Sequence, residues 1–405
     1  MFDAHSVRAD FPILSQKVYG KPLIYLDNAA TTQLPAKVLD TVTEHYLTQN
    51  GNVHRGSHYL SERSTAAMEN ARKTVQRFIN ARSDAQIVFT SGTTESLDIV
   101  ARSWLSHELK PGDRVIVSEF EHHSNFVIWQ QLCREKQAEF IVIPEKNGKV
   151  DMGYFRSSLN SRTRLVSVTM VSNVTGVRLP VEEIVDCAHS VGAVACIDAA
   201  QAVRHGIDAR LLGCDFLCFS GHKMMGPSGT GVLFISESLL DQMRPYRFGG
   251  GMVDTVTAEE STFSSMPGRM EAGTPNYPGI IGLGAAAEYL SSLGISGLSA
   301  YEEQLTAKLE IALLSVDGVT VLGGEQKKYS VVSAVIKGVH PYDAASVLDK
   351  YGVAVRAGSH CAQPILRRLG YDSVLRFSTA FYNTVEEIEA LEEILSRTID
   401  FFSRH

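Results

Sequence analysis

The sequence has little of what marks a nucleic-acid-binding, membrane-spanning or secreted protein. It has 45 acidic residues against 38 basic ones, for a net charge of -7, whereas nucleic-acid binding needs a basic surface. No apolar run reaches the roughly 18 residues that a transmembrane helix requires, and GIIGLGAAAEYL is too short. The opening MFDAHSVRADFPIL lacks the apolar core of a signal peptide. We therefore expect a cytoplasmic protein without nucleic-acid or membrane partners.

The six cysteines show neither a CxxC pair nor the spacing of a zinc site, so no metal is predicted. Cys187, Cys196, Cys214 and Cys218 stand in apolar contexts such as VACID and DFLCFS, which favour small buried side chains. Cys361 differs. It lies in RAGSHCAQP, residues 356–364, where Gly and Pro indicate a loop and the neighbours are cationic or titratable.

The middle of the chain alternates short apolar runs with helical patterns. Strands are predicted at residues 86–92, 114–120, 139–144, 164–170, 194–200 and 215–221, and helices at 93–109, 123–137 and 181–192. This alternation predicts an α/β fold with a mostly parallel sheet flanked by helices. After about Gly279, long helices and short strands indicate a smaller α+β domain. The expected division is a large domain over 21–280 and a small one over 281–405, with residues 1–20 packing on the small domain.

Polar residues follow the predicted strands, at the sheet edge where open α/β folds bind ligands. SGTTE (91–95) opens a helix that suits a phosphate, although a plain capped helix start reads the same way. EHHSN (121–125) holds two histidines, which metal-binding or surface roles would also explain. Asp198 ends an apolar strand and needs a cationic partner.

SGHK (220–223) places Lys223 on a turn after a buried strand. A surface lysine would be the plain interpretation, but a desolvated lysine has the lowered pKa that a Schiff-base amine needs. Pyridoxal phosphate requires a lysine, an acid for its ring nitrogen, a phosphate pocket and a flat group over the ring. All four fall at one sheet edge, so the sequence predicts a pyridoxal-phosphate enzyme.

The chain resembles the fold-type I pyridoxal-phosphate enzymes and, within them, the SUF-type (group II) cysteine desulfurases, a family that includes selenocysteine lyases. The motifs RADFPIL, YLDNAATTQ, GNVHRGSH, SGTTES, EHHSN, SNVTG, IDAAQ, SGHK, GPSGTG, FGGGM, EAGTPN, RAGSHCAQP and FYNT carry the resemblance over essentially the whole chain. Three positions depart from the commonest pattern, namely Ser91, Ala199 and Ser359.

The resemblance implies roles for individual residues. Lys223 would hold the cofactor as a Schiff base and move the α-proton, Asp198 would pair with the ring nitrogen, Gln201 would bond the ring hydroxyl, and His122 would stack on the ring and transfer protons. Thr94, Ser220 and His222 would bind the phosphate, joined by Thr274 of a neighbouring subunit in a homodimer. Asn173 and Arg376 would clamp the substrate carboxylate, Arg356 would lie beside the substrate, and His54 and Arg55 would line the entrance.

In such an enzyme Cys361 would take sulfur from L-cysteine as a persulfide and leave L-alanine. Arg356 and His360 would stabilise the thiolate, which is the reactive form. The short Cys361 loop resembles that of enzymes that pass sulfur to a SufE-like or SufU-like acceptor for Fe–S cluster assembly.

Several alternatives remain open on the sequence. Selenocysteine lyase and cysteine sulfinate desulfinase share the scaffold, although neither needs a thiol nucleophile. An enzyme like isopenicillin epimerase or kynureninase would have little use for RAGSHCA. A non-enzymatic scaffold or metal-binding protein would not take up the cofactor and would be colourless.

Overall fold

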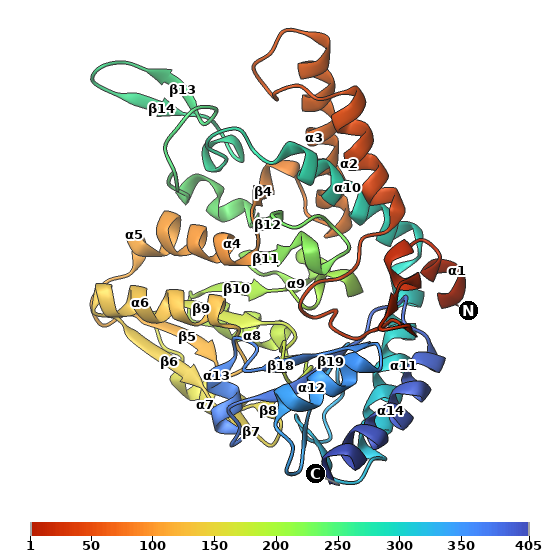
Figure 1. The fold of residues 1–405 in the computed structure, drawn as a ribbon. Helices are drawn as coiled ribbons and strands as arrows, with labels where there is room; N and C mark the ends of the chain where they lie inside the picture. Colours follow the sequence, from red (N-terminus) through yellow and green to blue (C-terminus); the bar gives the residue numbers. More distant parts are fainter. Residues whose placement is uncertain (1, 404–405) are drawn as a thin grey trace.

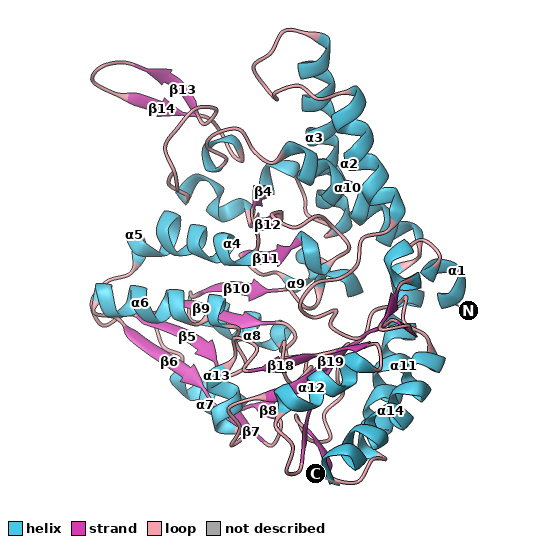
Figure 2. Ribbon diagram, in the orientation of Figure 1, coloured by secondary structure: helices cyan, strands magenta, loops and turns pink. Residues whose placement is uncertain are grey.

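The computed structural model describes residues 2–403, and a seven-stranded sheet forms its centre (Figures 1 and 2). The strands lie in the order β4 (Ile87–Thr90), β12 (Gly231–Ile235), β11 (Phe216–Ser220), β10 (Val194–Asp198), β9 (Thr163–Thr169), β5 (Arg114–Ser118) and β6 (Glu139–Ile143). β12 is antiparallel to both of its neighbours, whereas the other adjacent pairs are parallel. The mostly parallel α/β sheet predicted from the sequence is confirmed, and β12 is the strand that the prediction lacks.

Helices cover both faces of this sheet. One face packs against α4 (Thr93–Ile99) and α6 (Val127–Lys136), and the other against α8 (Val181–Ser190). Successive strand residues alternate between the two cores: Val115 and Val117 join one, and Ile116 joins the other. Both sets of side chains are buried because side-chain direction alternates along a strand, which explains the continuous apolar runs.

Further α-helices lie in the first 294 residues. They are α1 (Ala4–Arg8), α2 (Ala36–Thr48), α3 (Tyr59–Phe78), α5 (Ser106–Glu108), α7 (Met152–Ser158), α9 (Ala209–Leu212) and α10 (Tyr277–Ser292). The helix α4 continues through a π-helical stretch, Val100–Leu105, into α5. Three small hairpins lie outside the sheet: β1 (Lys17–Val18) with β2 (Lys21–Pro22), β7 (Glu145–Lys146) with β8 (Lys149–Val150), and the projecting β13 (Val253–Val256) with β14 (Ser261–Phe263) (Figure 1).

The C-terminal part of the chain forms a second, four-stranded antiparallel sheet. Its order is β15 (Val319–Val321), β16 (Val331–Ile336), β19 (Val374–Ser378) and β18 (Arg356–Gly358). The helices here are α11 (Ile295–Leu314), α12 (Pro341–Lys350), α13 (Gln363–Arg368) and α14 (Val385–Ser403). No helix within residues 2–403 is long and apolar enough to cross a membrane.

The N-terminal segment contacts this C-terminal part directly. β3 (Ile24–Tyr25) pairs in parallel with β17 (Val353–Ala354). Arg8 donates to the Tyr382 carbonyl at 2.9 Å and forms an ion pair with Glu387 at 2.7 Å. The motif following β3 is thereby brought beside the strands that carry Arg356 and Arg376.

Candidate active site

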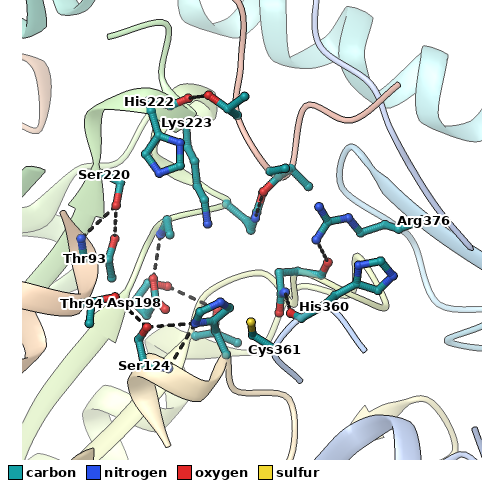
Figure 3. Close-up of a pocket in the computed structure, with 18 of the residues that line it drawn as sticks. Thr93, Thr94, Ser124, Asp198, Ser220, His222, Lys223, His360, Cys361 and Arg376 are labelled. Carbon is teal, nitrogen blue, oxygen red and sulfur yellow. Dashed lines mark hydrogen bonds between the residues drawn. The ribbon is translucent and has the colours of Figure 1, made fainter. Parts of the chain in front are cut away.

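A cavity of about 420 Å³ lies at the carboxyl ends of the central strands (Figure 3). Thr93 and Thr94 follow β4, Asp198 ends β10, and Ser220 ends β11. Parallel strands bring their carboxyl ends to one edge of the sheet, so these side chains converge although they are far apart in sequence. The four-stranded sheet closes the cavity from the other side. Its strands contribute Arg356 and Arg376, and the turn after β18 contributes His360 and Cys361.

Lys223 and Asp198 form the charged centre of the cavity. Lys223 ends the 3-10 turn Gly221–Lys223 directly after β11. Removal from water lowers the pKa of this amine to about 8, and the negative charge of Asp198 offsets part of that effect. Burial raises the pKa of Asp198, which the amide of Ala200 (2.9 Å) and the charge of Lys223 oppose. The pair therefore supplies an amine that is readily deprotonated and a carboxyl group in the same cavity.

Hydroxyl groups gather at the start of α4. Ser220 Oγ accepts from the Thr93 amide at 2.9 Å and lies 2.8 Å from Thr93 Oγ1. Thr94 Oγ1 lies 2.7 Å from Ser124 Oγ. These hydroxyls and the first amides of the helix form a neutral donor-rich corner that suits a phosphate. His222 lines the same cavity, and burial lowers the pKa of its imidazole to about 4, so it is neutral at pH 7.

A buried carboxyl group, Glu121, fixes the turn that carries the two histidines. Its oxygens accept from Ser118 Oγ and, at 2.6 Å, from Asn125 Nδ2. His122 follows it into the cavity, where its Nδ1 accepts the Ser124 amide at 3.1 Å. Burial and the charge of Lys223 lower the pKa of His122 to about 4. His122 therefore faces the cavity as a neutral ring.

Two arginines share one carboxylate at the opposite wall. Arg356 Nε and Nη2 donate to Asp27 at 3.1 and 2.9 Å, and Arg376 Nη2 donates to it at 3.3 Å. Arg376 Nη1 also donates to the Asn173 carbonyl at 3.1 Å, while its buried Nε meets no acceptor among the described residues. Burial lowers the pKa of Arg376 to about 10, yet it stays charged at pH 7. This wall offers a guanidinium with an unused donor to an incoming carboxylate.

Cys361 projects into the cavity from a tight turn between β18 and α13, and Figure 3 shows its sulfur inside the cavity. The Ala362 amide donates to the Ser359 carbonyl at 3.0 Å, and the two central residues are left-handed, His360 at φ 51° and Cys361 at φ 55°. Each such non-glycine residue costs about 1–2 kcal/mol. Contacts from elsewhere offset this cost: Asn173 Nδ2 donates to the His360 carbonyl at 2.7 Å.

The sequence and the fold both match known proteins. The family model for class-V aminotransferases matches residues 24–391. The chain belongs to the class-V aminotransferase family. It is 45% identical to a cysteine desulfurase of Escherichia coli over 400 residues, 98% of each chain. It is 44% identical to one from Synechococcus elongatus over 398 residues, which span 98% of this chain but 64% of that relative.

Solved structures agree with the sequence match. The cysteine desulfurase CsdA of Escherichia coli superposes with a TM-score of 0.92 at 37% identity, covering 99% of both chains. The apo cysteine desulfurase of Thermococcus onnurineus gives 0.93 at 36% identity over 98% of both. The predicted resemblance to the cysteine desulfurases is confirmed. The chain is thus a pyridoxal-phosphate-dependent enzyme of this class-V family.

The residues in the cavity fit pyridoxal phosphate. Gln201 donates through Nε2 to the Ala29 carbonyl at 2.8 Å, and its buried Oε1 meets no donor among the described residues, so it remains free for a bound molecule. Lys223 offers an amine for an aldehyde, and Asp198 offers a carboxylate for a protonated ring nitrogen. The hydroxyl corner at Thr94 and Ser220 offers donors for a phosphate.

Three predicted site residues do not reach this cavity within one chain. Thr274 lines a separate cavity with Glu271 and Arg247. His54 Nε2 lies 3.9 Å from Glu69 Oε1. Neither His54 nor Arg55 is among the described residues that line the cavity. The placement of His54 and Arg55 at the entrance therefore stays a prediction.

Two expectations need correction. Burial lowers the pKa of His360 to about 3, and its Nε2 lies 3.1 Å from the Val374 carbonyl, so it is neutral and brings no positive charge to the thiolate. Arg356 lines the same cavity as Cys361, and its effect on the thiolate stays a prediction. Among the apolar-context cysteines, Cys196, Cys214 and Cys218 are buried as predicted, but Cys187 is only half-buried.

The structure also adds residues that sequence reasoning did not assign. Thr93 and Ser124 complete the hydroxyl corner, and Asp27 holds both arginines. A signal for Asp27 existed, since an acid ends the apolar stretch LIYL just as Asp198 ends VACI. The partner arginines, more than 300 residues away, could not be identified from that signal.

Proposed function

We propose that this enzyme converts L-cysteine to L-alanine and keeps the sulfur as a persulfide on Cys361. The observation that carries the proposal is the Cys361 thiol in the same cavity as Lys223 and Asp198. Few other reactions would need a thiol there, because the cofactor's carbon chemistry itself requires none. The relatives named cysteine desulfurase support the same reaction.

The chain's own residues would divide the work as follows. Arg376 binds the substrate carboxylate through its unused donor, and Asn173 helps to orient it. Lys223 and the neutral His122 take and return protons on the bound substrate. Pyridoxal phosphate, when bound, would withdraw electrons from the substrate's α-carbon, so that the neighbouring carbon can accept the electron pair of the C–S bond when the sulfur is attacked.

Sulfur transfer then involves two sulfur atoms, that of Cys361 and that of the substrate. The Cys361 thiolate attacks the sulfur of the substrate, a new S–S bond forms, and the C–S bond breaks with its electron pair going to carbon. That carbon gains a proton, so L-cysteine and a thiol become L-alanine and a persulfide. Arg356, which lines the same cavity as Cys361, would stabilise the thiolate.

A second copy of the chain would complete the site. Thr274, His54 and Arg55 lie outside the cavity of their own subunit, and a homodimer would offer them to a neighbouring one. Helices α2 and α3 expose large apolar side chains close to this region, among them Leu47 at 78% and Tyr59 at 70% exposure. Such exposed apolar groups favour an interface. Light scattering on wild type and Leu47→Glu tests this: the wild type should be dimeric, and the variant should dissociate.

The acceptor would be a SUF-type protein, SufE-like or SufU-like, in Fe–S cluster assembly. Only residues 359–362 separate β18 from α13, so the loop is too short to carry the persulfide far from the cavity. Turnover should therefore be slow with a small thiol and rise when such an acceptor is added. Equal rates with dithiothreitol and with either acceptor would contradict this assignment.

The test of the reaction compares wild type with Cys361→Ala on L-cysteine and on L-selenocysteine. Alanine release from L-cysteine should fall to background in the variant, while its visible absorption band and its release of alanine from L-selenocysteine persist. Undiminished cysteine turnover in the variant would favour a lyase that releases its product directly. A preparation that stays colourless with added cofactor would refute the enzyme assignment altogether.

A further inference from the structure

His123, the second histidine of EHHSN, is not used by the site described above. Among the described residues, it is not one of those that line the cavity. It lies half-buried beside the turn of residues 359–362 that carries Cys361, here named the Cys361 turn. Its amide donates to the Cys361 carbonyl at 2.7 Å, and its Nε2 accepts the Gln363 amide at 3.3 Å. His123 therefore contacts the turn on both sides of Ala362.

We propose that His123 is a positioning residue that holds the Cys361 turn in its left-handed conformation and so keeps the thiol aimed into the cavity. This rests on the proposed function, in which Cys361 is the nucleophile. His123 touches neither cofactor nor substrate in this assignment. It acts through the turn.

The geometry of the turn explains why it needs holding. His360 and Cys361 are both left-handed, a conformation that non-glycine residues adopt only where their surroundings enforce it. The carbonyl of each is fixed by a donor from another part of the chain, His360 by Asn173 Nδ2 and Cys361 by the His123 amide. Without these donors the turn would relax, and the thiol would leave its place.

The imidazole of His123 secures the far end of the turn. Gln363 is the first residue of α13, so its amide has no acceptor within the helix. His123 Nε2 supplies that acceptor. Burial lowers the pKa of His123, which keeps the ring neutral and its Nε2 able to accept at pH 7. The buried Ala362, Ile365 and Leu366 anchor the helix itself, so the imidazole acts where the anchored helix meets the strained turn.

Two variants separate the acceptor from the bulk of the ring. His123→Phe keeps a ring but removes the acceptor, whereas His123→Gln keeps an acceptor oxygen. Loss of one hydrogen bond predicts that His123→Phe loses about three- to tenfold in kcat for L-cysteine with little change in KM, and that His123→Gln restores most of it. L-Selenocysteine turnover and the visible band of the holoenzyme should be the same in all three proteins, because those do not need the thiol.

Hydrogen exchange of the holoenzyme reads the turn itself. The Gln363 amide should be protected in wild type and in His123→Gln, and should exchange about three- to tenfold faster in His123→Phe. A freely exchanging Gln363 amide in wild type would overturn the proposal without any variant. So would a kcat loss that His123→Gln fails to restore, or equal losses on both substrates, which would indicate damage at His122.

The readouts also separate this proposal from the proposed function. If Cys361→Ala keeps full cysteine turnover, the nucleophile assignment fails, yet the exchange of the Gln363 amide still reports whether His123 holds the turn. If Cys361→Ala is inactive while His123→Phe behaves as wild type in exchange and turnover, the positioning role alone is wrong.

Discussion

Replacing Glu121 by glutamine should stabilise the folded protein by an amount that grows with pH. The side chain is fully buried, and burial, with a smaller contribution from negative Asp198, raises its pKa from 4.5 to about 8. Between these values the folded state keeps a proton that the unfolded chain has released. The contribution of Glu121 to the free energy of unfolding is therefore fully present below about pH 4.5, and it declines as pH rises towards 8.

The size of the effect follows from the two pKa values. Each pH unit in this interval costs about 1.4 kcal/mol, so wild type loses about 3 to 4 kcal/mol between pH 5 and pH 8 through this one group. Glutamine resembles the protonated acid and can keep the contacts with Ser118 and Asn125. It does not titrate, so Glu121→Gln avoids the loss.

Urea unfolding of both holoenzymes at pH 5, 6, 7 and 8 measures this difference. The free energies of unfolding should diverge steadily with pH, while Glu135→Gln, at an exposed position of α6, should follow wild type throughout. If the gap between Glu121→Gln and wild type is the same at all four pH values, Glu121 is ionised in the folded protein and the reasoning is wrong.

Other substitutions test the charged groups around the site and one buried ion pair outside it. Arg376→Lys should lower kcat/KM for L-cysteine about 10- to 100-fold, because a charge-assisted hydrogen bond contributes about 1.5–3 kcal/mol; alanine release measures it, and a change under threefold would argue against the clamp. Asp27→Asn should destabilise the protein by about 2–4 kcal/mol by leaving buried Arg376 without its carboxylate, and an unchanged urea midpoint would contradict this. Glu302→Gln should cost about 3–5 kcal/mol, because Arg204, 1% exposed, loses its buried ion-pair partner; thermal unfolding checks it, and an unchanged melting temperature would refute it.

The cofactor half of the candidate site could be predicted from the sequence. Lys223, Asp198, Ser220 and Thr94 each follow an apolar run, and the rule that parallel strands align their carboxyl ends brings them together. The prediction needed no knowledge of strand order. It is robust because any parallel arrangement of these strands places the same residues at the same edge.

The thiol half could not be assembled in this way. Its geometry depends on contacts between segments far apart in the chain, such as Asn173 with His360 and Asp27 with Arg376. The neutrality of His360 was missed for a related reason, since burial by distant segments sets its pKa. Sequence patterns indicate which helices and strands form, but they do not indicate which loop of one sheet contacts the other sheet.

The pairing of β3 with β17 has a consequence for the order in which a growing chain becomes an enzyme. Asp27 pairs with Arg356, which is synthesised 329 positions later, and with Arg376, which is synthesised 349 positions later. By contrast, Thr94, Asp198 and Lys223 are all present once residue 223 has been added. During synthesis the residues for the cofactor are present long before the thiol that would receive sulfur. Until residue 361 has been added, the nascent chain therefore lacks the thiol that the proposed persulfide transfer requires, whichever cofactor residues it already carries.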